Sequence, residues 1–443
     1  MASGSNLKKA LLAAGFLASV TAPSFGAEVF IDIERKKGSL IRMAMPEFLM
    51  KEPENADPEM AALGREAKEI LDFDIGFSGY FSSVENKEQQ DNINRKEFES
   101  DTIEWDLWKE LGTHALVKGE YSITPDNEIA IESRLFDVER REQIIGIRYT
   151  GSKSIFRKMV HRFADQIVYR FSGEAGIADT RIAFIARVKG HKELFLMDYD
   201  GENIQQITRH KSIILSPAWS PLGGKILFTT YKYGNPDLYS LDLITGEQQP
   251  VSNKRGLNTS AAWSPDGEKI ALTLSMRGNS DIYLANADGT GLKRLTRSPS
   301  IETSPSFSPD GKRLAYVSNR SGTPQIYTMD VDGKDQRRLT FEGDYNADPA
   351  WSPKGDQIAY AGIIDGKFNI QVKNIEGRYE KQLTFFSDNN IEPEWSSDGR
   401  HIAFTSSRNG SKQIFLMNAT GENQIQITNM RGGAIRPSWE QSK

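Results

Sequence analysis

Hydrophobic and polar positions repeat with a fixed period in the part of the chain that follows Thr180. An aromatic residue recurs every 44 residues (from 219 to 263, for example), at Trp219, Trp263, Phe307, Trp351, Trp395 and Trp439. Between these landmarks, short runs of apolar residues are separated by turns that contain glycine, such as Asp288-Gly289 and Asp332-Gly333. This pattern predicts four short antiparallel strands in each repeat. A period of roughly 40 to 50 residues with four strands is typical of the blades of a β-propeller.

The two ends of the repeat region differ in phase. The region begins at Thr180-Arg181-Ile182, which corresponds to the second strand of a blade, and its last strand, Pro437-Ser438-Trp439, corresponds to an innermost strand. We expect the last strand to complete the first blade, because this pairing removes two open sheet edges. The sequence therefore predicts an all-β propeller of six blades over residues 176–443, closed by the C-terminal strand.

The preceding region mixes helical and strand-like patterns, which predicts an α/β domain over residues 27–175. A helix should begin at Pro58 with Asp57 as its cap, and apolar residues at every fourth position predict a long helix from Ile155 to Phe171. The polar stretch from Ser82 to Thr102 is expected to be a surface loop. A short helix should end at Gly112, and strands are expected at 28–33, 40–49, 114–123, 129–135 and 144–149.

The first residues have the order of a secretory signal peptide. Lys8 and Lys9 precede the apolar run from Ala10 to Val20, and small residues follow up to Ala27. Cleavage after Gly26 places small residues at both restrictive positions, so residues 1–26 are predicted as signal peptide and Ala27 as the mature N-terminus. A membrane anchor is the alternative, but about 11 apolar residues are too few to cross a hydrocarbon core of ~30 Å as a helix.

Composition and charge exclude several classes of function. A formal net charge of -5 argues against a general nucleic-acid-binding protein, which needs a basic face to neutralise phosphates. The chain has no cysteine, so thiol catalysis and cysteine-bound zinc are excluded. The five histidines lack the spacing of a metal site, and His161 is expected at a surface or boundary position. We expect no cofactor and no metal.

Catalytic motifs are incomplete. Gly76-Phe77-Ser78-Gly79 lacks the second spacing of a nucleophile elbow, and no strand precedes a nucleotide-binding glycine motif. The repeated Asp-Gly pairs lack the further acids of a calcium loop and are interpreted as turns. The landmark aromatic residues are interpreted as links between neighbouring sheets rather than as rings that stack on a ligand. The sequence therefore favours a protein that is not an enzyme.

The loops before the innermost strands do not repeat, unlike the core. In a propeller these loops meet at one rim of the central channel, and several of them combine an apolar residue with a polar one, which is the composition of a protein-binding face. The alternative is that the apolar side chains only cover the ends of the blades. The candidate binding residues are Ile213, Ile214, Leu257, Asn258, Thr259, Ser260, Ile301, Glu302, Thr303, Tyr345, Asn346, Asp348, Asn390, Ile391, Glu392, Ile435 and Arg436.

A signal peptide, a small α/β domain and six blades with the pattern Ala262-Trp263-Ser264-Pro265-Asp266-Gly267 together resemble the TolB family of the bacterial Tol-Pal system. The Thr180-Arg181-Ile182-Ala183 junction resembles the family as well. The blade pattern alone is shared with relatives of prolyl oligopeptidase, so the order of the domains makes the resemblance specific. The resemblance implies a non-enzymatic adaptor in the periplasm, and we expect a monomer.

The resemblance also implies two partners. The lipoprotein Pal would bind the propeller rim at Leu257, Ser260, Thr303 and their neighbours, and would attach the protein peripherally to the outer membrane. The inner-membrane protein TolA would bind the mature N-terminal segment, which comprises Ala27, Glu28, Val29, Phe30, Ile31, Asp32 and Ile33. Such a link would support outer-membrane integrity and constriction at cell division. An edge strand in this segment can lie on its own domain or on a partner's sheet, which would couple the two partners.

A second class of function is also compatible with the sequence. An exported propeller enzyme, or a binder of carbohydrate polymers, would need acids and histidines clustered at the channel. Glu302, Asp348 and Glu392 lie on one predicted rim, where they could hold a cation, but no base or nucleophile accompanies them.

Overall fold

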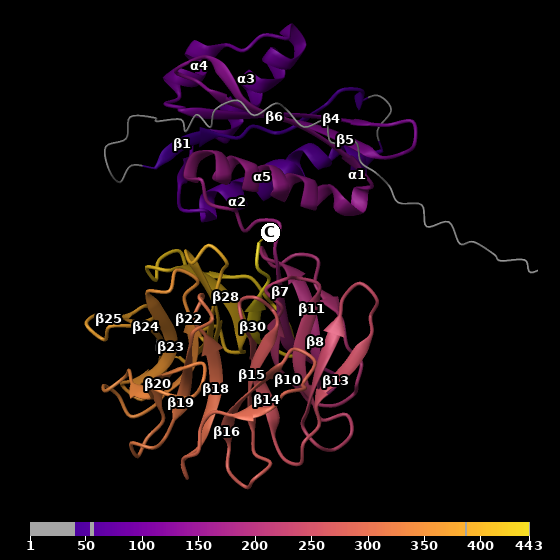
Figure 1. Ribbon diagram of the computed structural model, residues 1–443. Helices are drawn as coiled ribbons and strands as arrows, with labels where there is room; N and C mark the ends of the chain where they lie inside the picture. Colours follow the sequence, from indigo (N-terminus) through magenta and orange to yellow (C-terminus); the bar gives the residue numbers. More distant parts are fainter. Residues whose placement is uncertain (1–39, 54–56, 386–387, 443) are drawn as a thin grey trace, which may run out of the picture.

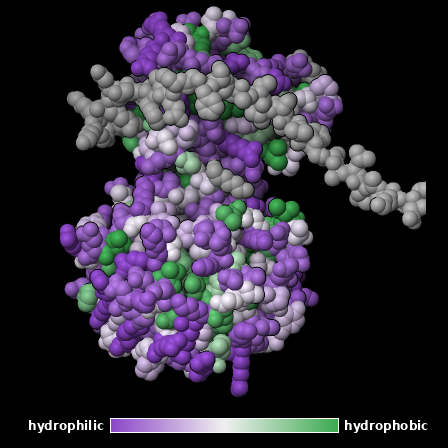
Figure 2. All heavy atoms as spheres, viewed as in Figure 1, coloured by the Kyte–Doolittle hydropathy of each residue, from purple (hydrophilic) through white to green (hydrophobic). Residues whose placement is uncertain are grey.

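The computed structural model describes residues 40–53, 57–385 and 388–442, which form an α/β part and a six-bladed propeller (Figure 1). The α/β part lies against one end of the propeller, and a narrow waist separates the two (Figure 2). The predicted fold class is confirmed. The predicted signal peptide at 1–26 and the predicted strand at 28–33 lie outside the described residues.

The α/β part is built on one mixed sheet, whose strands are β1 (Ile41–Ala44), β2 (Leu49–Met50), β3 (Phe81–Ser83), β4 (Ala115–Ile123), β5 (Ile129–Asp137) and β6 (Glu142–Gly151). The strand order is β3-β1-β4-β5-β6, and β2 pairs with β4. β1 runs parallel to β3 and β4, whereas β4, β5 and β6 form an antiparallel meander. The strand predicted at 40–49 is divided in two around Pro46, which has no N–H group to donate to a neighbouring strand.

Helices cover the sheet face that is turned toward the propeller (Figure 1). They are α1 (Pro58–Ala61), α2 (Leu63–Phe77) and α5 (Phe156–Ser172), and one turn of 3-10 helix (Lys153–Ile155) precedes α5. The predicted helix start is confirmed, because Asp57 Oδ1 accepts a hydrogen bond from Met60 N at 2.8 Å and Pro58 is the first helical residue. Leu71 of α2 and Phe163 of α5 are fully buried in the core, and burying a side chain of this size contributes about 1.5–3 kcal/mol.

The prediction of a surface loop from Ser82 to Thr102 is wrong. The helix α3 (Lys87–Ser100) occupies this stretch and, with α4 (Trp105–Glu110), lies over the other face of the sheet (Figure 1). Three of the four buried residues of α3 are polar and only Ile93 is apolar, so the helix has a weak amphipathic pattern. Glu97 is 1% exposed, and its carboxylate accepts hydrogen bonds from Trp108 Nε1 and Lys118 Nζ, each at 2.8 Å. Hydrogen bonds to buried polar groups thus take the place of the apolar contacts that the pattern would have revealed.

The segment that connects the two parts is held by one carboxylate. The two oxygens of Asp165 on α5 accept hydrogen bonds from Ala178 N at 2.8 Å and Asp179 N at 2.9 Å. Burial raises the pKa of Asp165 to about 7, although these N–H groups favour the ionised form. The connection is therefore fixed against α5, and the propeller has a defined position relative to the α/β part.

Each blade is an antiparallel sheet of four strands, ordered from the channel outward. Blade 1 contains β30 (Ala434–Trp439), β7 (Arg181–Val188), β8 (His191–Asp198) and β9 (Gln205–Gln206); blade 2 contains β10 (Ile214–Trp219), β11 (Lys225–Thr230), β12 (Asp237–Asp242) and β13 (Gln248–Ser252). Blade 3 contains β14 (Asn258–Trp263), β15 (Lys269–Leu274), β16 (Asp281–Asn286) and β17 (Lys293–Arg294); blade 4 contains β18 (Glu302–Phe307), β19 (Arg313–Ser318), β20 (Gln325–Asp330) and β21 (Arg337–Arg338). Blade 5 contains β22 (Asn346–Trp351), β23 (Gln357–Ile364), β24 (Lys367–Asn374) and β25 (Glu380–Gln382); blade 6 contains β26 (Asn390–Trp395), β27 (His401–Ser406), β28 (Gln413–Asn418) and β29 (Ile425–Gln426).

The ring is closed as the sequence predicts. β30 pairs with β7 and places Trp439 opposite Ile182, so the last strand completes the first blade. Trp439 Nε1 donates a hydrogen bond to Thr180 Oγ1 at 2.8 Å, and Arg181 forms an ion pair with Glu440 at 3.1 Å. Closure therefore combines a strand pairing with side-chain contacts at the end of the blade that faces the α/β part.

At two of the landmark tryptophans the indole forms a hydrogen bond to the neighbouring blade, whereas Trp351 Nε1 donates to Gly355 O of its own blade and Trp219 Nε1 has no hydrogen-bond partner among the described residues. Trp263 Nε1 donates a hydrogen bond to Ala218 O of the preceding blade at 3.1 Å. Trp395 makes the same contact with Ala350 O at 3.0 Å. The N–H groups of these two indoles form hydrogen bonds within the propeller and are not available to a ligand. We therefore consider the two ends of the propeller as candidate binding surfaces.

Candidate binding face of the propeller

The two ends of the propeller have different neighbours. The inner strands end on the side of the α/β part, and we call this the proximal end. Here Tyr199 OH donates a hydrogen bond to Asp74 Oδ1 at 2.7 Å, and His401 Nε2 lies 2.8 Å from Phe77 O. The starts of the inner strands lie at the opposite end, the lower end in Figure 1. We call this opposite end the distal face. It consists of the loops before the inner strands and the hairpins between the second and third strands of each blade.

Four candidate residues form an exposed apolar arc on the distal face. Each directly precedes an inner strand, and the exposed fractions are 46% for Ile213, 37% for Leu257, 53% for Ile301 and 39% for Tyr345. Because these positions are equivalent in successive blades, the four side chains follow one part of the channel mouth. An arc of apolar side chains surrounded by polar loops matches the anatomy of a protein-protein interface. The exposed residues Tyr233, Phe341 and Phe385 also belong to loops of this face, and the repeat pattern did not reveal them.

Other candidate residues do not reach the surface. Five candidates are the buried first residues of their inner strands: Ile214, Asn258, Glu302, Asn346 and Asn390. Asn258 shows what the polar members do, because its Nδ2 atom lies within hydrogen-bond distance of the carbonyl oxygens of Pro236, Lys254 and Gly256. These residues hold the loops in place, and a partner would touch the loops rather than the residues themselves. Thr259, Thr303, Ile391 and Ile435 are partly exposed.

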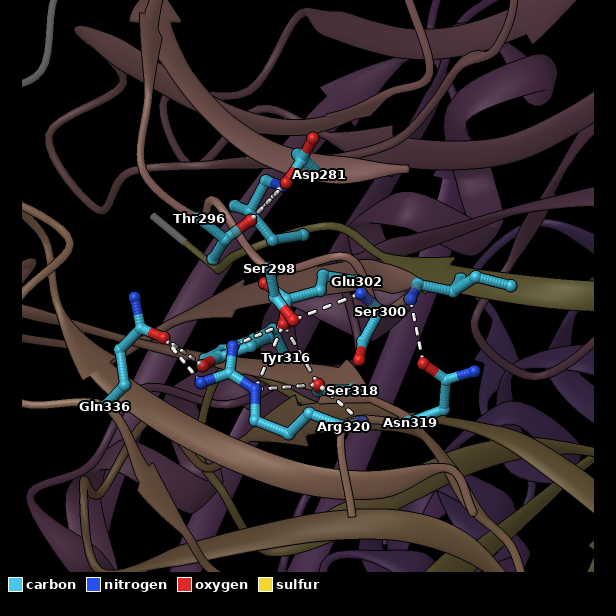
Figure 3. A network of polar contacts seen from close by, with 12 residues as sticks. Asp281, Thr296, Ser298, Ser300, Glu302, Tyr316, Ser318, Asn319, Arg320 and Gln336 are labelled. Atoms are coloured by element: carbon cyan, nitrogen blue, oxygen red, sulfur yellow. Dashed lines mark hydrogen bonds and ion pairs between the residues drawn. The ribbon is translucent and has the colours of Figure 1, made fainter. Parts of the chain in front are cut away.

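In blade 4 the buried position is a glutamate, and it organises the network shown in Figure 3. Glu302 Oε1 accepts hydrogen bonds from Ser318 Oγ at 3.0 Å and Arg320 Nε at 3.1 Å, while Oε2 has no hydrogen-bond partner among the described residues. The guanidinium of Arg320 lies over the ring of Tyr327, 5.0 Å from its centroid. Beside this network, Asn319 Oδ1 accepts a hydrogen bond from Ile301 N at 2.8 Å. The exposed Ile301 is thus held next to a buried charged network.

The wall of the channel is formed by a bulge in each inner strand. The bulged residue adopts a left-handed backbone conformation with φ between 49° and 59°, and the six residues are Ser216, Ser260, Ser304, Asp348, Glu392 and Arg436. All six line one cavity of about 570 Å³ in the centre of the propeller. Non-glycine residues rarely take this conformation, so its repetition in every blade indicates that the bulge is a fixed part of the fold.

Two acids of the channel wall share one cation. Arg436 Nε lies 3.1 Å from Glu392 Oε1, and Arg436 Nη1 lies 3.7 Å from Asp348 Oδ1. Burial raises the pKa of Asp348, although Arg436 opposes that effect. Burial also raises the pKa of Glu394 to about 8, although a backbone N–H from Trp439 favours its ionised form. The acids that an enzyme would need are therefore paired or favour protonation, and the described lining of the cavity includes no histidine.

At the proximal end, a buried polar cluster joins the α/β part to the propeller. His161 is 2% exposed, so its predicted place at a surface or boundary is wrong. Its Nδ1 atom lies 2.8 Å from Asp74 Oδ2, and burial lowers the pKa of His161 while the Asp74 carboxylate outweighs that effect and raises it to about 9. Asp74 also accepts the hydrogen bond from Tyr199 of the propeller. Sequence patterns missed this cluster because its members are far apart in the chain.

His161, Asp198 and Asp200 also lie close enough together to suggest a metal site. His161 Nε2 is 3.7 Å from Asp200 Oδ2, but Arg157 forms an ion pair with that same oxygen. We therefore interpret the group as an ion-pair network between α5 and the propeller, in which His161 Nε2 has no hydrogen-bond partner among the described residues.

Two further predictions concern the N-terminal segment and membrane spans. The predicted TolA-binding segment, Ala27–Ile33, lies outside the described residues. Within the described residues, no helix has the length and apolar character needed to span a bilayer.

Comparison with known proteins identifies both parts of the chain. A family model described as the TolB beta propeller domain matches residues 168–443, and one described as the TolB amino-terminal domain matches residues 29–144. Among solved structures, TolB from Acinetobacter baumannii superposes with a TM-score of 0.77 at 26% identity, covering 91% of this chain and 97% of that one. These matches confirm the resemblance that the repeat pattern and the domain order indicated.

Curated relatives are similar over part of their length. The Tol-Pal system protein TolB of Syntrophotalea carbinolica is 39% identical over 168 residues, which is 38% of this chain and 39% of that protein. The protein of the same name from Geobacter sulfurreducens is 40% identical over 168 residues, 38% of each chain. The one from Desulfosudis oleivorans is 36% identical over 226 residues, 51% of each. The chain thus spans about two fifths of the length of the first two relatives.

Proposed function

The chain belongs to the TolB family, and from this membership we propose that it is a non-enzymatic periplasmic adaptor of the Tol-Pal system. The observation that carries the proposal is the exposed apolar arc of Ile213, Leu257, Ile301 and Tyr345 at the channel mouth. A catalytic propeller would instead concentrate free acids and bases in the channel, where this chain pairs Asp348 and Glu392 with Arg436.

The distal face is the site that we propose for the lipoprotein Pal. Its exposed apolar residues would enter the centre of the interface, and the polar loops around them would form the rim. The buried asparagines and the Glu302 network keep these loops in one conformation, which lowers the entropy lost on binding. Binding to Pal would place the protein at the outer membrane, in support of envelope integrity and constriction at division.

The second proposed partner is TolA, through residues Ala27–Ile33. Residues 1–26 would direct export and be removed, leaving Ala27 at the mature N-terminus in the periplasm. Val29, Ile31 and Ile33 alternate with Phe30 and Asp32, so the segment can add as a strand to the edge of a partner's sheet. The same segment could also pair with its own domain. Binding of Pal and binding of TolA would then affect each other, because each would favour one of the two positions of the segment.

Substitution in or beside the apolar arc should weaken binding to Pal. We expect Ile301→Arg and Thr303→Arg each to reduce the affinity for the purified periplasmic part of Pal by at least about tenfold, because each places a charge in the desolvated centre of the interface. Isothermal titration calorimetry measures the change. The matched control is Ile244→Arg, since Ile244 is 89% exposed but lies in a loop at the proximal end. Equal affinities for Pal in all three variants and the unsubstituted protein would place the Pal site elsewhere.

Deletion of residues 27–33 from the mature protein should abolish binding to TolA and spare binding to Pal. A second variant keeps the length of the segment but replaces Val29 and Ile31 by Asp, which removes the apolar face of the strand and should have the same effect as the deletion. Pull-down of each purified partner by the tagged variants distinguishes the two interactions. If both partners are lost, or if neither is lost, the assignment of the segment to TolA is wrong.

A further inference from the structure

Exposed cations lie in many loops of the distal face. Six of them occupy four successive loops of blades 1 to 3, and we call this group the basic arc: Arg209, Lys211, Lys232, Lys254, Arg255 and Arg277. Further exposed cations lie in loops of blades 1 and 6 and before blade 4: Arg187, Lys189, Arg297, Lys412 and Arg431. All six residues of the basic arc are exposed, and none of them forms an ion pair within the described residues. The side chain of Lys232 lies 5.2 Å from the ring centroid of the exposed Tyr233. A chain with a net charge of -5 therefore carries an unpaired basic surface at its candidate binding site.

Acidic residues lie on the opposite side of the same face. Glu342, Asp344 and Asp365 are exposed and Asp388 is partly exposed, all in loops that enter, cross or leave blade 5, and we call this group the acidic arc. Lys367 is an exposed cation among them. In a ring of six blades, blade 5 lies across the channel from blade 2, which is the centre of the basic arc. The distal face thus has an acidic side at blade 5, across the channel mouth from the basic arc, and further cations in loops of blades 1 and 6 and before blade 4.

The apolar arc joins the two sides. Ile213 and Leu257 lie within the loops of the basic arc, whereas Tyr345 directly follows Asp344 of the acidic arc. A partner that covers the apolar residues must therefore also cover both groups of charges. Charges at the rim of an interface act on the rate of association and on orientation more than on the final affinity.

We propose that the basic arc receives an acidic surface of the partner protein, and that the acidic arc opposes the reverse orientation. This inference rests on the proposed binding of Pal and adds the chemistry of the matching surface. Unpaired cations would attract the partner across roughly one Debye length, about 8 Å in physiological salt, and would turn its acidic side toward blades 1 to 3 before contact. An anionic membrane fits less well, because the acidic arc would repel it at blade 5 of the same face.

The test is the association rate constant for the periplasmic part of Pal, measured by stopped-flow fluorescence. For the unsubstituted protein, we expect the rate to fall by about tenfold or more between roughly 50 and 500 mM salt. In the double variant Arg255→Glu/Arg277→Glu, the rate at low salt should fall by about tenfold or more, with a smaller change in the dissociation rate. The matched control, Lys225→Glu/Lys312→Glu, changes two exposed lysines at the proximal end and should alter the rate by less than about twofold.

A second pair of substitutions tests the orientation. In Asp344→Lys/Asp365→Lys, association with Pal should stay within about threefold of the unsubstituted rate or become faster, because the acidic arc does not attract the partner. A large loss of rate in this variant, with none in Arg255→Glu/Arg277→Glu, would overturn the proposal. So would a salt-independent association rate of the unsubstituted protein, a measurement that requires no substitution.

Two further outcomes separate the proposal from the one on which it rests. In the first, the variant Arg255→Glu/Arg277→Glu binds Pal normally and loses only its attachment to vesicles of phosphatidylethanolamine and phosphatidylglycerol. The basic arc then contacts a membrane, so the charge inference fails while the proposed Pal site stands. If the unsubstituted protein does not bind Pal at any salt concentration, the proposed function fails and the inference fails with it. Circular dichroism of each variant checks that the exposed substitutions leave the fold unchanged.

Discussion

Deletion of residues 433–443 is expected to lower the free energy of unfolding of the propeller by roughly 5 kcal/mol or more. The deletion removes β30, the inner strand of blade 1, and with it the fully buried residues Ala434 and Trp439. It also removes Arg436, which leaves Glu392 and Asp348 in the channel wall without their cation. Loss of one partner from a fully buried ion pair costs about 3–5 kcal/mol, and the loss here should be smaller because the Arg436 side chain is 34% exposed. The exposed inner edge of β7 would add to this loss.

Denaturant unfolding followed by tryptophan fluorescence measures the effect of the deletion, since the landmark tryptophans of the other blades remain and report on the ring. The matched control removes only residues 441–443, which follow β30 and leave the strand pairing intact. We expect the control to unfold within about 1 kcal/mol of the full chain. A deletion of 433–443 that gives an unchanged unfolding curve would show that β30 does not contribute to the stability of the ring.

Substitution Asp74→Ala should be the most damaging single change at the contact between the two parts, with an expected loss of about 3–5 kcal/mol. Asp74 forms hydrogen bonds with His161 Nδ1 on α5 and with Tyr199 OH on the propeller, and all three side chains are buried. Without the Asp74 carboxylate, His161 must lose its proton or remain charged beside only the more distant Asp200, which already pairs with Arg157. The control Tyr199→Phe removes only the hydroxyl contact and should cost about 1 kcal/mol.

The pH dependence of stability distinguishes this mechanism from a simple loss of packing. The pKa of His161 is raised from 6.5 to about 9 in the folded protein, so the charged imidazole stabilises the fold in full below pH 6.5 and loses this contribution as the pH rises through 9. From about pH 7.5 to 9.5 the unsubstituted protein should lose about 2 kcal/mol of unfolding free energy. In Asp74→Ala this slope should largely disappear. An equal slope in both proteins would exclude His161 as its source.

The sequence predicted the propeller well because the same structural solution recurs in six blades. Trp263 and its equivalents repeat at fixed spacing, so each turn and strand boundary is supported by several copies of the same local signal. The α/β part has no repetition, and there the prediction depended on amphipathic patterns. The α5 helix has a strong apolar face, which predicts a helix, whereas α3 buries Gln90 and Glu97 and its polar sequence predicts a loop.

The candidate binding residues include both exposed and buried positions. A polar residue at the junction of a loop and a strand, such as Asn258 or Glu302, has the composition of an exposed site, and only the three-dimensional structure shows that it is buried and held by backbone or side-chain partners. The neighbouring Leu257 and Ile301 show the opposite, since apolar residues here remain exposed. Charges that gather from successive blades, as in the basic arc, become visible only when the ring is assembled.

Closure by β30 has a consequence for the order in which the molecule is made. Thr180 and Trp439, which are hydrogen-bonded across blade 1, lie 259 residues apart. Blade 1 therefore lacks the strand beside β7 until the residues of blades 2 to 6 have been synthesised. During that interval the apolar edge of β7, with Ile182 and Phe184, is accessible to wrong strands and needs protection from them. The ring of Trp439 stacks on Tyr199, 6.4 Å between centroids, where the propeller meets the α/β part. The joint between the two parts is therefore completed last, when the whole ring has been synthesised and closed.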